Sequence, residues 1–353
     1  MPISMLMLGA SYGSLLATKL VLAGHDVTLV CLPEEVALFN ADGARVRIKP
    51  RGHDDFVELD SRDGPGRLSA AGPTEVDPKS FDIVGLAMQE PQYRAPEVKD
   101  LIARIARSAR PTMSIMNMPP PPFLARIAAI DPDGLASAYT DYSVWRGFAP
   151  GLMTLASPDP QAMRPPGEPL NVLQVNLPTN FKVAPFADDA HTDLLRRMEA
   201  NIEALRFGSG QIELPVKLRV HDSLFVPLAK WAMLVTGNYR CVTSGAPISI
   251  RDAVHGDLEL SRRIYAAVGT LCERLGAKPG DLVPFEKYAK AAESLIRPSS
   301  AARALDAGAP AIERLDKLVQ LLSRQTGVGV PAVDEIAALV DAKLLENAAP
   351  MPA

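Results

Sequence analysis

Short apolar runs alternate with amphipathic stretches from the start of the chain to about residue 215. Residues 3–8 and 26–32 are apolar runs of strand length, while residues 14–23 have helical spacing and end before Gly24. Two such runs joined by one helix form a strand–helix–strand unit with parallel strands. The pattern predicts that the chain opens with a parallel α/β fold.

Further strand and helix patterns follow in the same region. Strand-like runs occupy residues 44–49, 55–61, 81–88, 112–118 and 170–177. The first two of these runs alternate as the strands of a hairpin do. Helical periodicity covers residues 98–109 and 189–205. We therefore expect an α/β domain with a parallel-type sheet over residues 1–215.

The pattern changes after the strand-like residues 210–220. Four helical stretches follow with almost no strand candidate between them, at residues 224–238, 258–275, 309–323 and 333–345. Such a run of helices predicts a separate all-helical domain. We assign it to residues 216–346 and expect residues 347–353 to form a flexible tail.

Composition and charge narrow the classes of partner. The 353 residues include 37 Lys or Arg and 41 Asp or Glu, for a formal net charge of −4. This balance, without a basic block, argues against a nucleic-acid partner. No apolar run approaches the ~18 residues that span a membrane, and residues 1–9 lack the features of a signal peptide. We expect a soluble, cytoplasmic protein.

The three cysteines, Cys31, Cys241 and Cys272, are far apart in the sequence and have no metal-type spacing. An odd number of scattered cysteines is typical of structural thiols in a reducing compartment. The sequence therefore predicts neither a disulfide framework nor a metal site.

The turn GASYGS after the first strand has two chemical interpretations. As Gly9-x-Ser11-x-x-Ser14 it is a dinucleotide-binding loop with serines in place of its second and third glycines. As Gly9-x-Ser11-x-Gly13 it matches the G-x-S-x-G turn of a serine hydrolase, with Ser11 as the nucleophile. A hydrolase sheet needs strands before its nucleophile, so a position this close to the N-terminus favours the dinucleotide. A third interpretation is a turn that binds nothing.

In the dinucleotide interpretation, the phosphates lie at the N-terminus of the helix that follows the turn. Serine is the smallest polar replacement for glycine, and its hydroxyl can donate to a phosphate oxygen. The predicted cofactor contacts in this turn are Gly9, Ser11, Tyr12, Gly13 and Ser14.

Four separated segments, in their order and spacing, resemble the ketopantoate (2-dehydropantoate) reductase family. They are residues 5–30, PTMSIMNMPPP at 111–121, HDSLFVPLAKWAMLVTGNY at 221–239 and the stretch 297–336. The resemblance implies a Rossmann-type domain followed by an all-helical substrate and dimerisation domain. It also implies NAD(P)-dependent reduction of a 2-keto acid in the cleft between the two domains, or oxidation of the 2-hydroxy acid. We expect a homodimer that acts on a small carboxylate.

The resemblance gives roles to particular residues. Lys230 matches the family's catalytic lysine, which would stabilise negative charge on the substrate carbonyl oxygen and donate a proton to it. Asn117, Asn238 and Ser300 would hold substrate. Without the resemblance, Lys230 is an ordinary surface lysine, Asn238 a helix C-cap, and Ser299 or Ser300 a helix N-cap. A straight helix would separate Lys230 from Asn238 by ~12 Å.

Two positions depart from the family pattern on the substrate side. Leu234 replaces an asparagine that follows the lysine, and Ala311 replaces the acidic residue that contacts the pantoate hydroxyl. The nearest carboxylate, Glu313, would lie ~200° around a helix from Ala311. We therefore expect a 2-keto acid other than ketopantoate.

The cofactor side departs from the pattern as well. Leu32, followed by Glu34 and Glu35, stands where NADP-using members carry a basic residue, and Gln89 replaces a strand-end lysine. A 2′-phosphate would meet carboxylates and no arginine, so NAD is favoured over NADP. Leu32, Gln89 and Asn117 complete the predicted cofactor contacts. Because the glycine loop is altered, an alternative function remains: a Rossmann-type protein that binds a dinucleotide or another ligand without turnover.

Overall fold

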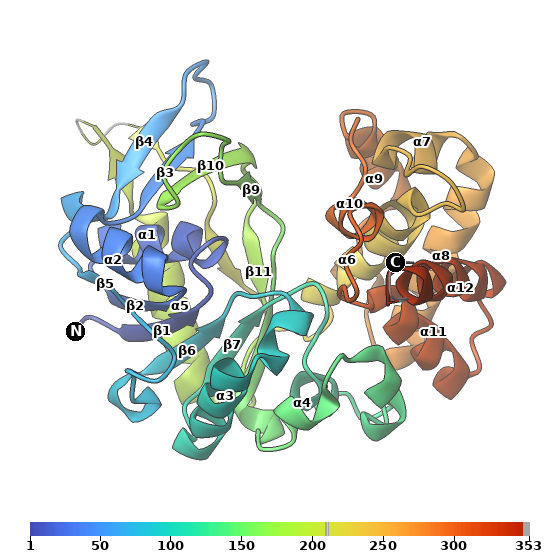
Figure 1. Ribbon diagram of the computed structural model, residues 1–353, viewed down its shortest axis with the longest axis horizontal. Coiled ribbons are helices and arrows are strands. Elements are labelled where there is room, and N and C mark those ends of the chain that lie inside the picture. Colours follow the sequence, from blue (N-terminus) through green and yellow to red (C-terminus); the bar gives the residue numbers. More distant parts are fainter. Residues whose placement is uncertain (209, 211, 349–353) are drawn as a thin grey trace, which may run out of the picture. The chain divides into compact units, whose positions relative to one another are not determined.

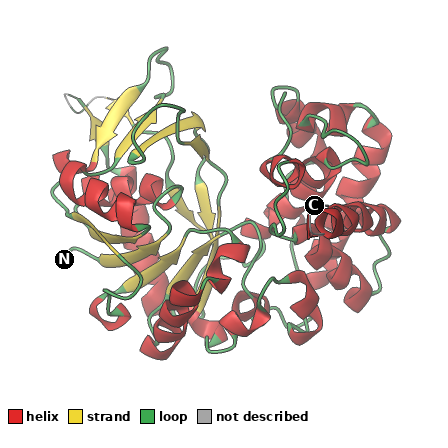
Figure 2. Ribbon diagram, viewed as in Figure 1, coloured by secondary structure: helices red, strands yellow, loops and turns green. Residues whose placement is uncertain are grey.

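The computed structural model describes residues 1–208, 210 and 212–348. The chain forms two compact units. The sheet unit consists of Met1–Met88, Gln92–Phe123 and Val144–Asp222, and the helical unit consists of Gln89–Pro91, Leu124–Ser143 and the chain from Ser223 onward. In the described residues every strand belongs to the sheet unit (Figure 2). The division lies close to the expected boundary at residue 215, but local patterns did not indicate that two internal segments join the helical unit.

The main sheet has eight strands in the order β14-β11-β8-β7-β6-β1-β2-β5. Their bounds are β1 (Ser4–Leu8), β2 (Asp26–Val30), β5 (Leu68–Ala71), β6 (Ile83–Leu86), β7 (Thr112–Ile115), β8 (Met153–Ser157), β11 (Phe181–Val183) and β14 (Leu218–Val220). The six strands from β8 to β5 are mutually parallel, and β11 is antiparallel to β8. Strand order reverses at β1, between β2 and β6, which is where open α/β sheets bind ligands.

A second sheet has the order β4-β3-β10-β9. Its strands are β3 (Arg45–Ile48), β4 (Val57–Asp60), β9 (Gln161–Met163) and β10 (Val172–Leu177). The expected hairpin is present, since Arg45 pairs with Asp60 in antiparallel register. The strand predicted at residues 170–177 joins this sheet, next to β3, and not the main sheet. A short pair, β12 (Arg206–Phe207) and β13 (Ile212–Glu213), completes the strands of the described residues.

Four longer helices belong to the sheet unit: α1 (Gly13–Leu22), α2 (Pro33–Asp42), α3 (Pro96–Ser108) and α5 (Asp189–Glu203). Nine of the ten residues of α1 are buried, because the helix contacts strand β2, the second sheet and α5. It lies among β1, β2 and α5 in Figure 1. Gly24, at φ +87°, ends the helical segment as the sequence predicts.

The helical unit contains α6 (Lys230–Met233), α7 (Ile250–His255), α8 (Leu258–Leu275), α9 (Phe285–Ala292), α10 (Ser300–Asp306), α11 (Leu315–Thr326) and α12 (Pro331–Ala348). A further single turn, α4, spans Pro121–Leu124. Helix α8 has the predicted bounds. No helix in the described part of the chain is both long enough and apolar enough to cross a membrane.

Two predictions for the C-terminal region are wrong. Residues 309–314 are not helical, because Gly308 adopts φ +84° after α10 and Pro310 disfavours helix in the residue before it. Asn347 lies in α12, where its side-chain amide donates to the carbonyls of Leu305 (2.8 Å) and Ala309 (3.0 Å). The rest of the predicted tail, residues 349–353, lies outside the described residues.

Candidate functional site

The turn after β1 brings backbone close to backbone. Gly9 has φ +99°, and a Cβ there would lie 2.7 Å from the Met88 Cγ and 2.8 Å from the Ala87 carbonyl oxygen. A Cβ at Gly13 would lie 2.9 Å from the Met7 Cγ, so the start of α1 packs directly on β1. The geometry requires both glycines, as the turn of a dinucleotide-binding fold does.

The serines of this turn have different roles from those expected. The close packing of helix on strand occurs at Gly13, one residue before Ser14. The Ser14 hydroxyl donates to the Ser11 carbonyl (2.8 Å), while the side chain of Ser11 is exposed. The first N–H groups of α1 have no carbonyl partner within the helix, and such groups bind anions. The turn thus has the close approach and the donors that a pyrophosphate needs.

Tyr12 joins this turn to the loop after β8. Its hydroxyl donates to the Pro160 carbonyl (2.7 Å), and its ring meets Phe181 of β11 edge-on, with ring centres 5.8 Å apart. Burial, reinforced by the negative charge of Asp159, raises the pKa of Tyr12 well above its usual value. Tyr12 is therefore a neutral hydrogen-bond donor, and its side chain is committed to the protein itself.

The end of β2 differs from the expectation. Leu32 is 60% exposed, and Glu35 in the first turn of α2 accepts the Leu32 N–H (3.1 Å). Glu35 also forms an ion pair with Arg164, which follows β9 in the second sheet. The prediction that no arginine lies at this strand end is wrong. No local pattern marked Arg164, because it is more than a hundred residues away from Glu35 in the sequence.

The other predicted contacts lie after the ends of β6 and β7. Asn117, half-buried, follows β7 in the sheet unit, and its strand ends at the same edge as the turn after β1. Gln89, exposed, follows β6 and is grouped by its contacts with the helical unit. The structure therefore brings Leu32, Asn117 and the glycine turn to one edge of the sheet.

In the helical unit, Lys230 begins α6 and is half-buried, between buried Ala229 and Trp231. Helix α6 continues as a π-helical turn over Leu234–Asn238. The segment from Lys230 to Asn238 is therefore not the regular α-helix for which the ~12 Å separation was calculated. Single π-helical turns occur frequently at functional sites.

A tyrosine of α9 holds the π-helical turn. The Tyr288 hydroxyl donates to the Met233 carbonyl (3.0 Å), and a Cβ on Gly237 would overlap that hydroxyl. Gly237 is thus the residue that allows Tyr288 to reach the backbone. The sequence pattern suggested only that Gly237 and Asn238 end a helix.

Asn238 and the serine pair lie together in this unit. The Ser299 hydroxyl donates to the Asn238 carbonyl (2.7 Å) and accepts the Ala302 N–H (3.1 Å), so Ser299 is the N-cap of α10. Ser300 is exposed and is the first residue of that helix. Ser299 fixes the backbone of Asn238, which leaves Ser300 as the predicted substrate contact of the pair.

The two substrate-side departures lie in different settings. Leu234 is 5% exposed, in the first position of the π-helical turn. Ala311 and Glu313 precede α11 in irregular backbone, so the ~200° separation calculated for a helix is wrong. The Glu313 carbonyl accepts the Tyr239 hydroxyl (2.6 Å), and its carboxylate accepts the backbone N–H of Glu90 (3.4 Å).

Glu90 is a buried carboxylate that the sequence analysis missed. It is 2% exposed and accepts the backbone N–H of Thr140 (3.0 Å) and the Thr140 hydroxyl (2.8 Å). Burial, together with the charge of Glu90, raises the pKa of Tyr139 well above its usual value. In the sequence, Glu90 is marked only by its place a few residues after the buried strand β6, whereas its partner Thr140 is distant.

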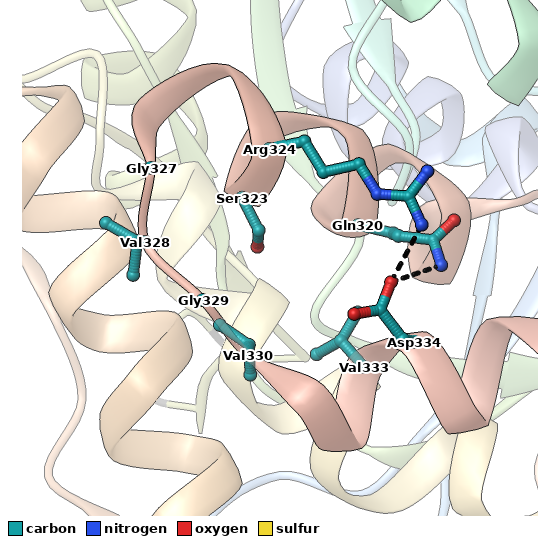
Figure 3. Close-up of a pocket in the computed structure, with 9 residues that line it drawn as sticks. All are labelled: Gln320, Ser323, Arg324, Gly327, Val328, Gly329, Val330, Val333 and Asp334. Carbon is teal, nitrogen blue, oxygen red and sulfur yellow. Dashed lines mark hydrogen bonds and ion pairs between the residues drawn. The ribbon is translucent and has the colours of Figure 1, made fainter.

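Two cavities of the helical unit are lined by other residues. A cavity of about 200 Å³ lies at the turn between α11 and α12, where Asp334 accepts from Gln320 (2.7 Å) and Arg324 (2.9 Å) (Figure 3). A cavity of about 330 Å³ lies between α6 and α8 and is lined by Ala232 of α6 and by Ala229, the residue before this helix. Neither of these two cavities is lined by a predicted site residue.

Neither a protein-family model nor a curated protein matches the sequence. Solved structures match over the whole length. A PanE/ApbA family ketopantoate reductase from Ralstonia eutropha JMP134 has a TM-score of 0.65 at 17% identity, covering 98% of this chain and 99% of that chain. A 2-dehydropantoate 2-reductase from Methylococcus capsulatus has a TM-score of 0.66 at 15% identity, covering 99% of each. This chain has the ketopantoate reductase fold.

A D-mandelate dehydrogenase bound to NADH and anilino(oxo)acetate shares this fold, with a TM-score of 0.63 at 14% identity over 98% of this chain and 99% of that one. The prediction of a Rossmann-type sheet domain followed by an all-helical region is therefore confirmed. A serine hydrolase with Ser11 as its nucleophile would need a histidine base beside that serine. His25, the histidine nearest in sequence, already accepts the Ile3 N–H at Nδ1 (3.0 Å) and lies 3.1 Å from the Asn201 amide.

Proposed function

We propose that this protein is an NAD(P)-dependent oxidoreductase that reduces a 2-keto acid or oxidises the corresponding 2-hydroxy acid. The observation that carries the proposal is the turn after β1. Gly9 lies against the Ala87 carbonyl there, and Gly13 lets the start of α1 pack on β1. This turn lies in a fold shared over its whole length with ketopantoate reductases and a D-mandelate dehydrogenase.

The cofactor half of the proposed site belongs to the sheet unit. The pyrophosphate would lie at the first N–H groups of α1, with the exposed hydroxyl of Ser11 as a further donor. Leu32 and Asn117 flank this turn at the same edge of the sheet, and Gln89 is assigned to the cofactor as well. When bound, the nicotinamide supplies the hydride.

Lys230 would act on the carbonyl oxygen of the keto acid. Reduction places negative charge on that oxygen, which an adjacent ammonium group stabilises and then protonates. Asn238 and Ser300 would hold the remaining polar groups of the substrate, together with Asn117. The π-helical turn supports this assignment, because it fixes the backbone between Lys230 and Asn238.

The substrate would be a 2-keto acid other than ketopantoate. Leu234 and Ala311 are apolar where hydroxyl recognition would need a polar partner. A buried hydroxyl without a partner costs about 1–3 kcal/mol. A keto acid with an aliphatic or aromatic side chain avoids that cost.

Fluorescence titration of the full chain with NADH and NADPH tests the cofactor assignment. We expect saturable binding that the substitution Ser11→Glu weakens at least ~10-fold, because its carboxylate would repel the pyrophosphate. Ser80→Glu is the matched control. Ser80 is also exposed, but it precedes β6 and therefore lies at the opposite edge of the sheet from the turn after β1.

Absence of binding by either dinucleotide would contradict the proposal. If a fluorophosphonate probe then labelled Ser11, the proposed function would be that of a serine hydrolase. Binding without turnover of any 2-keto acid would instead indicate a dinucleotide-binding protein that is not an enzyme.

A further inference from the structure

An ion pair links helix α2, which follows β2, to the residue after β9 of the second sheet. Glu35 lies in the first turn of α2, and Arg164 follows β9, the edge strand of the second sheet. Strand β9 pairs with β10 and β10 with β3, and this pairing helps to position Arg164. In dinucleotide-binding folds, the residues after the second strand contact the adenosine ribose. The pair therefore lies where NAD would place its ribose 2′-hydroxyl and NADP its 2′-phosphate.

Glu35 is fully engaged by the protein. One carboxylate oxygen accepts the Leu32 N–H (3.1 Å) and the other pairs with Arg164. The Glu35 side chain is 8% exposed, while that of Arg164 is 25% exposed. Both Glu35 oxygens thus already have a protein partner, whereas part of the Arg164 side chain is accessible.

The charges around the pair sum to a negative value. Glu34 is exposed and directly precedes Glu35 in the sequence, so this segment carries two carboxylates, and Arg164 pairs with one of them. Burial and the charge of Glu35 raise the pKa of Cys31 to about 12, so its thiol adds no charge at neutral pH. A 2′-phosphate brought to this place would meet net negative charge, although an arginine is present.

We propose that Glu35 masks Arg164 and thereby determines the choice between NAD and NADP. While the pair is intact, the strand end accepts an adenosine ribose with a free 2′-hydroxyl. Without the Glu35 charge, the Arg164 guanidinium becomes available to a 2′-phosphate, which it can bind with two hydrogen bonds. This inference rests on the proposed function and assigns its cofactor.

The substitution Glu35→Gln separates charge from structure. Glutamine in the third position of a helix can still accept the N–H of the residue before the helix, so the start of α2 is kept. Glu34→Gln is the matched control, because it removes the same charge one residue away without releasing Arg164. The double variant Glu35→Gln/Arg164→Met removes the arginine that the single variant unmasks.

The test measures binding of ADP-ribose and 2′-phospho-ADP-ribose to the full chain by calorimetry, with no nicotinamide and no turnover. We expect the wild type to prefer ADP-ribose. Glu35→Gln should shift the affinity ratio at least ~10-fold toward the phosphorylated probe, and Glu34→Gln only ~3-fold. The double variant Glu35→Gln/Arg164→Met should lose most of the affinity for 2′-phospho-ADP-ribose that Glu35→Gln gains.

The outcomes separate this inference from the proposed function. If both probes bind and Glu35→Gln leaves their affinity ratio unchanged, the inference is wrong and the proposed function stands. A wild type that prefers the phosphorylated probe would show that Arg164 is not masked, and would also contradict the inference. If neither probe binds to any variant, the proposed function fails and the inference fails with it.

Discussion

Lys230 is the residue on which the proposed chemistry depends. Its ammonium group would stabilise the developing alkoxide and protonate it, so Lys230→Ala should lower turnover by ~10²–10⁴. Dinucleotide affinity should change little, because the cofactor turn belongs to the sheet unit. Steady-state kinetics and a binding titration on the same preparation give both values.

A lysine control accompanies this variant. Lys290, in α9 of the same unit, has a side chain that is 80% exposed, and Lys290→Ala should keep full turnover. Equal turnover in Lys230→Ala and Lys290→Ala would remove Lys230 from the mechanism.

Lys19 is a second lysine with an unusual environment. It is 1% exposed on α1, donates to the Pro215 carbonyl (3.1 Å), and has its pKa lowered to about 7 by burial and then by the charge of Lys217. Between pH 7 and ~10, the unfolded chain binds this proton and the folded protein does not, so the free energy of unfolding rises with pH. Below pH 7, Lys19 is protonated in both the folded and the unfolded chain. The gain in the free energy of unfolding that its deprotonation gives at higher pH is then lost.

Lys19→Met removes the titration and provides the test. The free energy of unfolding of wild type minus that of Lys19→Met should increase from pH 7 to pH 10, with a slope of up to ~1.4 kcal/mol per pH unit. Urea unfolding at each pH gives the difference, and exposed Lys79→Met serves as the control. A difference that stays constant over this range would show that Lys19 is protonated in the folded protein.

Residues that form local patterns were predictable from the sequence. Gly9 and Gly13 were identifiable because a strand, a tight turn and a helix follow one another in the chain. Arg164 and Glu90 were not, since each acquires its partner, Glu35 or Thr140, through contacts distant in the sequence. Side-chain pairing across elements leaves no periodic signal.

At the scale of elements, the π-helical turn after Lys230 is the feature with the clearest test. Gly237→Ala should lower the free energy of unfolding by about 1–3 kcal/mol, because the added methyl group overlaps the Tyr288 hydroxyl. Turnover should fall as well, since the turn connects Lys230 and Asn238. Denaturant unfolding and kinetics report the two effects.

Two further variants make this prediction specific. Tyr288→Phe removes the overlapping hydroxyl, so it should recover part of the stability lost in Gly237→Ala. Gly280→Ala adds a methyl group with no atom within 4 Å, and should change stability by less than ~0.5 kcal/mol. If Gly237→Ala is as stable as Gly280→Ala, the contact with Tyr288 does not constrain the turn.

Elements with a strong period were predictable, and short or irregular ones were not. Helix α8 has three to four apolar residues per two turns and appears with its predicted bounds. Strands β9 and β11, with three residues each, are too short to show alternation. The apolar spacing of the π-helical turn does not separate it from an α-helix in the sequence, and its contact with Tyr288 comes from a distant segment.

At the scale of the whole molecule, the fold alone does not determine which substrate binds, because that depends on the side chains of the site. Leu234 and Ala311 each remove a polar partner, so apolar 2-keto acids should be reduced faster than ketopantoate, by roughly 10-fold or more. Ala311→Glu should narrow this gap by restoring a carboxylate for the hydroxyl. The prediction fails if the wild type reduces ketopantoate at least as efficiently as every other acid tested.

The central claim is that both units serve one reaction, the nicotinamide-dependent reduction of a 2-keto acid. The most direct measurement is nicotinamide absorbance during incubation of the full chain with a panel of 2-keto acids, with NADH and with NADPH, in wild type and Lys230→Ala. We predict turnover of at least one acid with an aliphatic or aromatic side chain, and its loss in Lys230→Ala. No turnover of any acid with either dinucleotide would contradict the account.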